Sequence, residues 1–123
     1  MWPFRRLPYW RRGEKLAARY LRRAGYRILE RNARLGRYEI DIIAREGDTI
    51  AFVEVKTRQD DRIAAPEDNV TPIKRRHIRR AAHQYIDRHR DPDTYYRFDV
   101  VSVLLPERGR ATITLYRNAF PDH

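Results

Sequence analysis

The sequence predicts a single α/β domain in which helices pack against a mixed β-sheet. Three observations support this prediction. Apolar residues recur with helical spacing in two segments, they alternate or run continuously in segments of strand length, and glycine or proline separates the segments. The predicted order is helix, three strands, helix and two strands. A chain of 123 residues, 41% of them hydrophobic, is long enough for one domain and too short for two ordinary ones.

The first helix is predicted over residues 14–24, after a basic and aromatic arm over residues 1–12. Its apolar side chains fall on one stripe, and Gly25 is a typical C-terminal stop. A short strand is expected over residues 26–30, and a loop is expected to follow through Asn32 and Gly36. The folded domain should then cover residues 13–123.

An antiparallel hairpin is expected next. Residues 38–45 and 49–57 have the composition of strands, and the Glu-Gly-Asp sequence at residues 46–48 is typical of a tight turn. A polar loop over residues 58–70 follows the hairpin.

The second helix is expected to begin at Thr71 and Pro72, because threonine is a good N-cap and proline is tolerated at the first helical position. The helix should end before Pro92. Strands over residues 96–105 and about 111–117 complete the predicted sheet.

The charge distribution points to a polyanionic partner. The net charge is +10, and residues 1–38 hold 12 Lys and Arg against two acidic residues, whereas the rest of the chain holds 15 of each sign. A basic surface of this kind favours nucleic acid first and an acidic membrane surface second.

Several function classes are disfavoured by composition. The chain has no cysteine, and Ser102, its only serine, lies within an apolar run, so nucleophilic Cys or Ser chemistry is not expected. No apolar stretch approaches the ~20 residues of a membrane span, and the first residues lack the apolar segment of a secretory signal. We therefore expect a cytoplasmic protein with no membrane partner and no small-molecule substrate.

The predicted hairpin carries the most specific chemical pattern. Alternation places Glu54 and Lys56 on one face of their strand, and Asp41 should lie within a rung or two of Glu54 on the paired strand. Two carboxylates so close repel each other unless a cation or a proton lies between them, and Mg²⁺ or Mn²⁺ suits oxygen ligands. The Val55 carbonyl and waters would complete the metal's ligands. An ion pair between Glu54 and Lys56 would give the same pattern without catalysis.

These residues also carry a resemblance. Glu39-Ile40-Asp41-Ile42-Ile43-Ala44, followed by Phe52-Val53-Glu54-Val55-Lys56-Thr57-Arg58, resembles the PD-(D/E)xK nuclease superfamily. Within it, the chain is most similar to the YraN-like bacterial family of predicted endonucleases, which are relatives of the archaeal Holliday-junction resolvases. The similarity includes Gly13-Glu14, Gly25-Tyr26, Asn32, Lys74 and the segments 97–101 and 118–120. It implies a restriction-endonuclease-like α-β-β-β-α-β core, the order that the periodicity indicates separately.

The resemblance implies roles for four residues. Asp41 and Glu54 match the metal-binding carboxylates, Lys56 matches the motif lysine, and Glu14 matches the additional acidic residue of resolvase-like members. Two alternatives remain open at this point. Glu14 could only complement the dipole of the first helix, and Glu39 could be a further ligand or simply an exposed charge.

The predicted function is that of a Mg²⁺- or Mn²⁺-dependent DNA endonuclease acting on branched or otherwise irregular DNA. The alternative is a non-catalytic or assembly-dependent nucleic-acid-binding protein of the same fold. The sequence leaves a homodimer open. Trp2 and Trp10 could stack on unpaired bases, although packing of the arm onto the domain is the favoured role. The residues expected to contact DNA are Lys15, Arg19, Arg22, Lys74, Arg75, Arg79 and Arg80.

Overall fold

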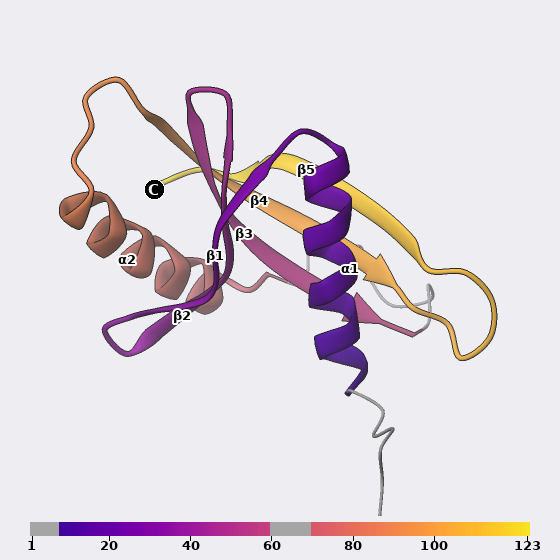
Figure 1. The fold of residues 1–123 in the computed structure, drawn as a ribbon. Coiled ribbons are helices and arrows are strands. Elements are labelled where there is room, and N and C mark those ends of the chain that lie inside the picture. Colours follow the sequence, from indigo (N-terminus) through magenta and orange to yellow (C-terminus); the bar gives the residue numbers. More distant parts are fainter. Residues whose placement is uncertain (1–7, 60–69) are drawn as a thin grey trace, which may run out of the picture.

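A computed structural model describes residues 8–59 and 70–123, and it has one five-stranded sheet with a helix on each face (Figure 1). The elements, in chain order, are α1 (Tyr9–Arg23), β1 (Arg27–Leu35), β2 (Tyr38–Glu46), β3 (Thr49–Arg58), α2 (Pro72–Arg88), β4 (Tyr95–Leu104) and β5 (Thr112–Phe120). This order confirms the predicted α/β fold class with a restriction-endonuclease-like core.

The strands follow one another across the sheet in the order β1-β2-β3-β4-β5. All neighbouring pairs are antiparallel except β3 and β4, which are parallel. A parallel pair needs a crossover connection, and α2 lies in that connection. The expected hairpin of β2 and β3 is confirmed, with Gly47 at φ +62° in its turn.

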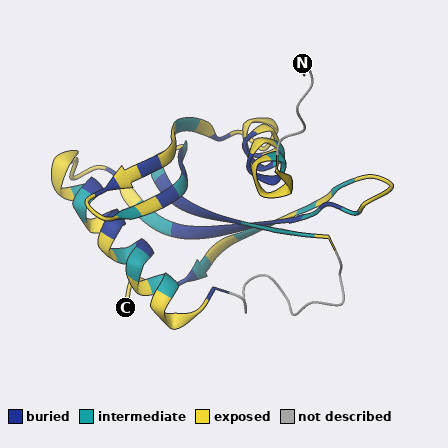
Figure 2. Ribbon diagram, turned by 90° about the horizontal axis from the view of Figure 1, so that it is seen from below, coloured by how far each residue is buried: buried dark blue, intermediate teal, exposed yellow. Residues whose placement is uncertain are grey.

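Each face of the sheet has its own hydrophobic core, and Figure 2 shows the two helices on opposite sides of the buried strands. Ile78, Ala82 and Tyr85 of α2 pack against Phe52 and neighbouring side chains on one face. On the other face, α1 packs against side chains that alternate with those, including Val53 and Val101. The central strands are therefore buried on both faces, which explains their continuous apolar runs.

Helix α1 begins at Tyr9, so the predicted start at residue 14 is wrong and residues 9–12 of the predicted arm are helical. Residues 1–7 of that arm lie outside the described residues. Residues 1–12 show no clear apolar periodicity, so their helical part could not be recognised from the sequence pattern. In the structure a Cβ at Gly13 would overlap the Thr57 side chain, so glycine lets α1 approach β3 closely.

Strand β1 is also longer than predicted, and the expected loop at Asn32 is wrong. The strand continues to Leu35, with an irregularity in register between Ile28 and Glu30. Asn32 lies within the strand at φ +51°. Most of β1 is exposed or half-buried, so its sequence has no clear alternation to predict the strand.

The second helix begins as predicted. The Thr71 hydroxyl accepts a hydrogen bond from the Lys74 N–H at 3.1 Å, and Pro72 is the first helical residue. The predicted loop over residues 58–70 lies mostly outside the described residues. Neither α1 nor α2, the two helices of the described ranges, is long and apolar enough to span a membrane.

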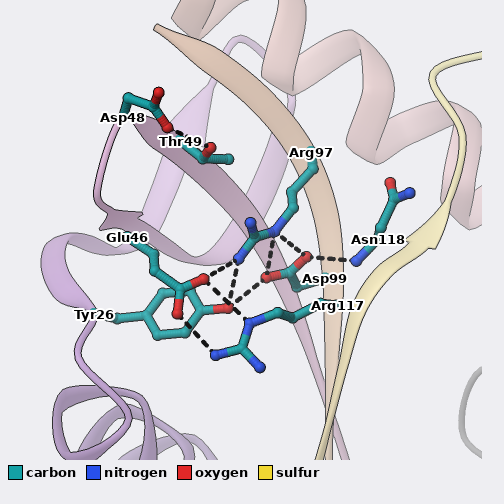
Figure 3. Close-up of polar contacts among 8 residues, drawn as sticks. All are labelled: Tyr26, Glu46, Asp48, Thr49, Arg97, Asp99, Arg117 and Asn118. Atoms are coloured by element: carbon teal, nitrogen blue, oxygen red, sulfur yellow. Dashed lines mark hydrogen bonds and ion pairs between the residues drawn. The ribbon is translucent and has the colours of Figure 1, made fainter.

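A buried polar network, which the sequence did not predict, joins the sheet on its α1 side (Figure 3). Asp99 is fully buried and accepts hydrogen bonds from the Tyr26 hydroxyl at 2.9 Å and from the Arg97 Nε at 3.0 Å. The backbone N–H of Asn118, which is at φ +52°, also donates to Asp99 at 2.9 Å. Three segments far apart in the sequence therefore meet at one carboxylate.

Glu46 ties the same network to the end of β2. It accepts hydrogen bonds from Arg97 at 2.6 Å and from Arg117 at 2.8 Å. Its pKa falls to about 2, chiefly because of the hydrogen bond from Arg117 and with a further contribution from Arg97. Burial and the Asp99 charge raise the pKa of Tyr26 to about 12, so Tyr26 stays protonated and donates to Asp99.

We predict that Tyr26→Phe lowers the free energy of unfolding by about 1–3 kcal/mol, because the buried Asp99 carboxylate loses one of its donors. Urea unfolding at pH 7 measures the change. Tyr95→Phe is the matched control, since that ring is 67% exposed. Equal stability of Tyr26→Phe and the unmodified protein would contradict the structural role of this network.

Candidate active site

The candidate site lies where β2 separates from β3 (Figure 1). The paired residues of these strands run from Glu46 opposite Thr49 to Ile42 opposite Val53, and the pairing ends there. The next residues on the two strands are Asp41 and Glu54. The Asp41 Oδ2 accepts a hydrogen bond from the Val55 N–H at 2.8 Å, so a side chain takes the place of the next backbone partner.

Glu54 is a buried carboxylate that faces two ammonium groups. Its side chain is on the α2 side of the sheet, and the residue is only 6% exposed. The Lys56 Nζ lies 4.0 Å and the Lys74 Nζ 3.8 Å from Glu54 Oε1. Lys56 comes from the same strand, whereas Lys74 comes from the first turn of α2. The predicted ion pair of Glu54 and Lys56 is therefore present, and a second cation joins it.

Glu14 approaches the site from α1. It is the sixth residue of the helix and is buried, and the first turn holds no acidic residue. The helix-dipole interpretation of Glu14 is therefore wrong, because that effect is confined to the first turn. Glu14, Glu39 and Asp41 line one cavity of about 670 Å³ between α1 and the first two strands. Glu39 itself is exposed.

The pKa values of Glu14, Asp41 and Glu54 are all raised above their usual range. Burial is the largest cause at each one. The charge of Asp41 further raises the pKa values of Glu14 and Glu54, and Glu54 reaches about 7. Lys74 and Lys56 oppose this effect at Asp41 and Glu54, with Lys74 the stronger of the two. The carboxylates thus lie in surroundings where an added cation or a proton is favourable.

The donor set suits a small hard cation. Within residues 8–59 and 70–123, no three His, Cys, Asp or Glu side chains are grouped closely enough to hold a metal ion among them. Mg²⁺ commonly binds through one or two carboxylates and keeps several waters, so Asp41 and Glu54 meet that smaller requirement. Val55 contributes its N–H to Asp41. Coordination by the Val55 carbonyl stays a prediction.

The basic residues expected to contact DNA occupy different environments. Lys15 lines the cavity beside Glu14, and Arg19 and Arg22 are exposed on α1. Arg80 is exposed on α2.

Two further arginines of α2, Arg75 and Arg79, pack against Phe120 at the end of β5. The guanidinium carbons of Arg75 and Arg79 lie 5.2 and 5.6 Å from the Phe120 ring centroid. Their Nε atoms donate to the backbone carbonyls of Val70 and Pro121, respectively, both at 2.9 Å. Both side chains are thus held against Phe120, with Arg79 also bound to the C-terminal segment and Arg75 to the residue before the Thr71 N-cap.

Sequence reasoning missed two features of the site. It did not place Lys74 beside Glu54, because that contact depends on how α2 packs. It also favoured packing of the arm as the role of Trp10, whereas Trp10 lines the cavity with Glu14. The sequence held one signal for this: Trp10 and Glu14 are four residues apart, which places them on one face of a helix that begins before Trp10.

The fold and the site together define a class of protein. The five-stranded mixed sheet with a helix on each face is that of a restriction-endonuclease-like core, and its central strands separate at Asp41 and Glu54. The sequence profile described as "Uncharacterised protein family UPF0102" matches residues 13–103. The chain belongs to this family, which confirms the predicted YraN-like relationship.

Relatives from several organisms support the same assignment. A UPF0102 protein of Caldicellulosiruptor saccharolyticus is 43% identical over 109 residues, covering 88% of this chain and 92% of that protein. One from Syntrophomonas wolfei is 44% identical over 116 residues, covering 94% of this chain and 98% of that protein. The match to the Syntrophomonas wolfei protein therefore extends over nearly the whole of both chains.

Among solved structures, the chain is similar to Pyrococcus furiosus SfsA in complex with Ca²⁺, with a TM-score of 0.40 and 14% identity. The match covers 85% of this chain and 60% of the SfsA chain. Family membership rests on the sequence relatives and not on this structure.

We predict that Glu54→Gln stabilises the metal-free protein at pH 8. Between the ordinary pKa of 4.5 and about 7, folded Glu54 keeps a proton that the unfolded chain has lost, so stability falls as pH rises through this window. The gain at pH 8 should be roughly 3 kcal/mol at most and should disappear near pH 4, since each pKa unit is worth about 1.4 kcal/mol.

Urea unfolding in EDTA at several pH values tests this prediction. The exposed Glu107 provides the control variant, Glu107→Gln. If Glu54→Gln is less stable than the unmodified protein at pH 8, the Glu54 carboxylate is not destabilised by burial and its raised pKa is contradicted.

Proposed function

We propose that this protein is a cytoplasmic, divalent-metal-dependent DNA endonuclease that acts on branched or otherwise irregular DNA. The observation that carries the proposal is the pair of carboxylates, Asp41 and Glu54, at the separation of β2 and β3, with the Lys56 ammonium 4.0 Å from Glu54. Two repelling carboxylates beside a lysine are a costly arrangement for stability alone, and they suit the hydrolysis of a phosphodiester.

Each residue would have a distinct task in that reaction. A bound Mg²⁺ or Mn²⁺ would polarise the phosphate and lower the pKa of a water molecule. Asp41 and Glu54 would hold the ion, and the Val55 N–H keeps the Asp41 carboxylate in place. Lys56 would orient the attacking water or stabilise the negative charge that develops on the phosphate oxygens. Glu14, from α1, would add a further carboxylate on the side of Asp41.

The charge of the protein supports DNA as the substrate. The net charge of +10 and the exposed arginines of α1 favour a polyanion. Lysine and arginine contacts to phosphates do not read sequence, so binding should depend on the shape of the DNA more than on its bases.

A non-catalytic or assembly-dependent nucleic-acid-binding protein is the second candidate. Within the described ranges, no group of three potential metal ligands is found, and this observation favours a site that is incomplete alone. The purified protein should be incubated with linear duplex, single-stranded, flap and four-way DNA in Mg²⁺, Mn²⁺ or EDTA. Metal-dependent cleavage supports the first candidate, and binding without cleavage under all conditions supports the second.

We predict that Asp41→Asn weakens Mn²⁺ or Mg²⁺ binding at least tenfold while leaving the fold intact, because one of two carboxylate ligands is lost. The asparagine oxygen can still accept the hydrogen bond from the Val55 N–H. Isothermal titration calorimetry measures the affinity, and Asp122→Asn, at an exposed position away from the site, is the control. Equal metal affinity of Asp41→Asn and the unmodified protein would exclude Asp41 as a ligand.

We predict that Lys56→Ala reduces the cleavage rate by several orders of magnitude with little change in DNA affinity, because its ammonium would act mainly on the transition state. Single-turnover cleavage and fluorescence anisotropy separate the two effects. A simple phosphate contact would behave differently, lowering affinity and reducing the salt slope by about one unit. Loss of affinity with an unchanged rate would therefore refute the catalytic role of Lys56.

A further inference from the structure

The cavity beside Asp41 has features that holding a metal ion does not require. Besides its carboxylates, the cavity of about 670 Å³ is lined by Trp10, Arg11 and Lys15 of α1 and by Arg31 and Asn32 of β1. Its volume is within the range of small-molecule binding sites. The three cationic side chains balance the charge of the three carboxylates. The Trp10 ring and the Asn32 amide add surfaces that suit a neutral, flat group.

Trp10 is placed to stack on such a group. Its side chain belongs to neither hydrophobic core of the described chain, and it is 48% exposed. The Arg11 guanidinium carbon lies 5.0 Å from the Trp10 ring centroid. Exposed aromatic rings beside cations are the means by which proteins bind single-stranded nucleic acid, because bases stack on the ring while the cations contact phosphates.

Asn32 faces the same cavity from an unusual backbone position. It lies in β1 between the rungs formed by Arg31 with Ile42 and by Ala33 with Ile40, which places it opposite Asp41. Its φ of +51° is in the left-handed region, where glycine would be unstrained. Here the chain carries an amide instead, and an amide both donates and accepts hydrogen bonds, as the edge of a base requires.

We propose that this cavity binds one unpaired nucleotide of the DNA substrate, next to the carboxylates that would cleave it. Trp10 stacks on the base, Asn32 contacts the base edge, and Arg11, Lys15 and Arg31 contact the adjoining phosphates. The proposal rests on the proposed nuclease function and names its substrate class, which is DNA with an unpaired nucleotide at a junction, flap or gap. In continuous duplex the neighbouring base pairs cover both faces of each base, so the ring has no face to stack on.

The test uses the full chain with its single other tryptophan replaced, Trp2→Phe, so that fluorescence reports Trp10 alone. In EDTA, where no cleavage occurs, single-stranded and gapped DNA should quench Trp10 fluorescence, and blunt duplex of the same sequence should not. Trp10→Ala should lower affinity for single-stranded and gapped DNA about 5- to 100-fold, the range for loss of one stacked base, and affinity for duplex less than twofold. Trp10→Phe should retain most of the affinity.

Two matched controls separate the cavity from the rest of the surface. Tyr20→Ala removes a ring that is 36% exposed on the same helix and does not line the cavity, so it should leave affinity unchanged. Asn32→Gly and Asn118→Gly both replace asparagine at a positive φ, and only the first should weaken binding to unpaired DNA. Thermal melting establishes that each variant is folded.

The outcomes distinguish this proposal from the proposed nuclease. Equal quenching by duplex and single-stranded DNA, or an equal loss of affinity for both with Trp10→Ala, would overturn the nucleotide subsite even if the protein cleaves DNA. Selective quenching and selective loss would support the subsite even if no metal yields cleavage, and the nuclease proposal alone would then fail.

Discussion

The hydrogen bond from the Val55 N–H to the Asp41 carboxylate is the contact on which the site depends. Two antiparallel strands can separate only if the backbone groups that lose partners find others. Here the Asp41 side chain accepts the hydrogen bond that a backbone carbonyl of β2 would otherwise accept. The strand β2 can therefore leave β3 while the Val55 N–H keeps a partner. The same bond holds the Asp41 carboxylate in place, and Asp41 also lines the cavity between α1 and the first two strands.

The packing of the two helices then brings further groups to this opening from opposite faces of the sheet. Gly13 lets α1 lie close against Thr57, which places Glu14 and Trp10 beside the Asp41 side of the site. On the other face, the N-cap at Thr71 begins α2 so that Lys74, in its first turn, reaches Glu54. Local features set where each helix begins and how closely it approaches, and the packing of the helices on the sheet then brings these side chains to the carboxylates.

The parts of the structure that could be predicted from the sequence are those that local patterns determine. Alternation and a turn identified the hairpin, and with it Asp41, Glu54 and Lys56, because residues close in sequence bring these groups together. The contact of Lys74 with Glu54 and the network around Asp99 depend on tertiary packing between distant segments, for which no periodicity exists. The start of α1 was missed because residues 1–12 have no clear apolar periodicity, and the length of β1 was missed because most of the strand is exposed or half-buried.

Two buried carboxylates, Asp99 and Glu54, differ in how closely their donors approach. Asp99 is fully buried, and donors from Tyr26, Arg97 and Asn118 bind it at 2.9–3.0 Å. Glu54 is almost as buried, yet its ion-pair contacts are 3.8 and 4.0 Å long, and its pKa rises to about 7. A carboxylate needed only for stability would have closer donors, as Asp99 does. Asp99 is thus satisfied by close donors, whereas Glu54 lacks such donors at the point where β2 separates from β3, which agrees with the proposed function.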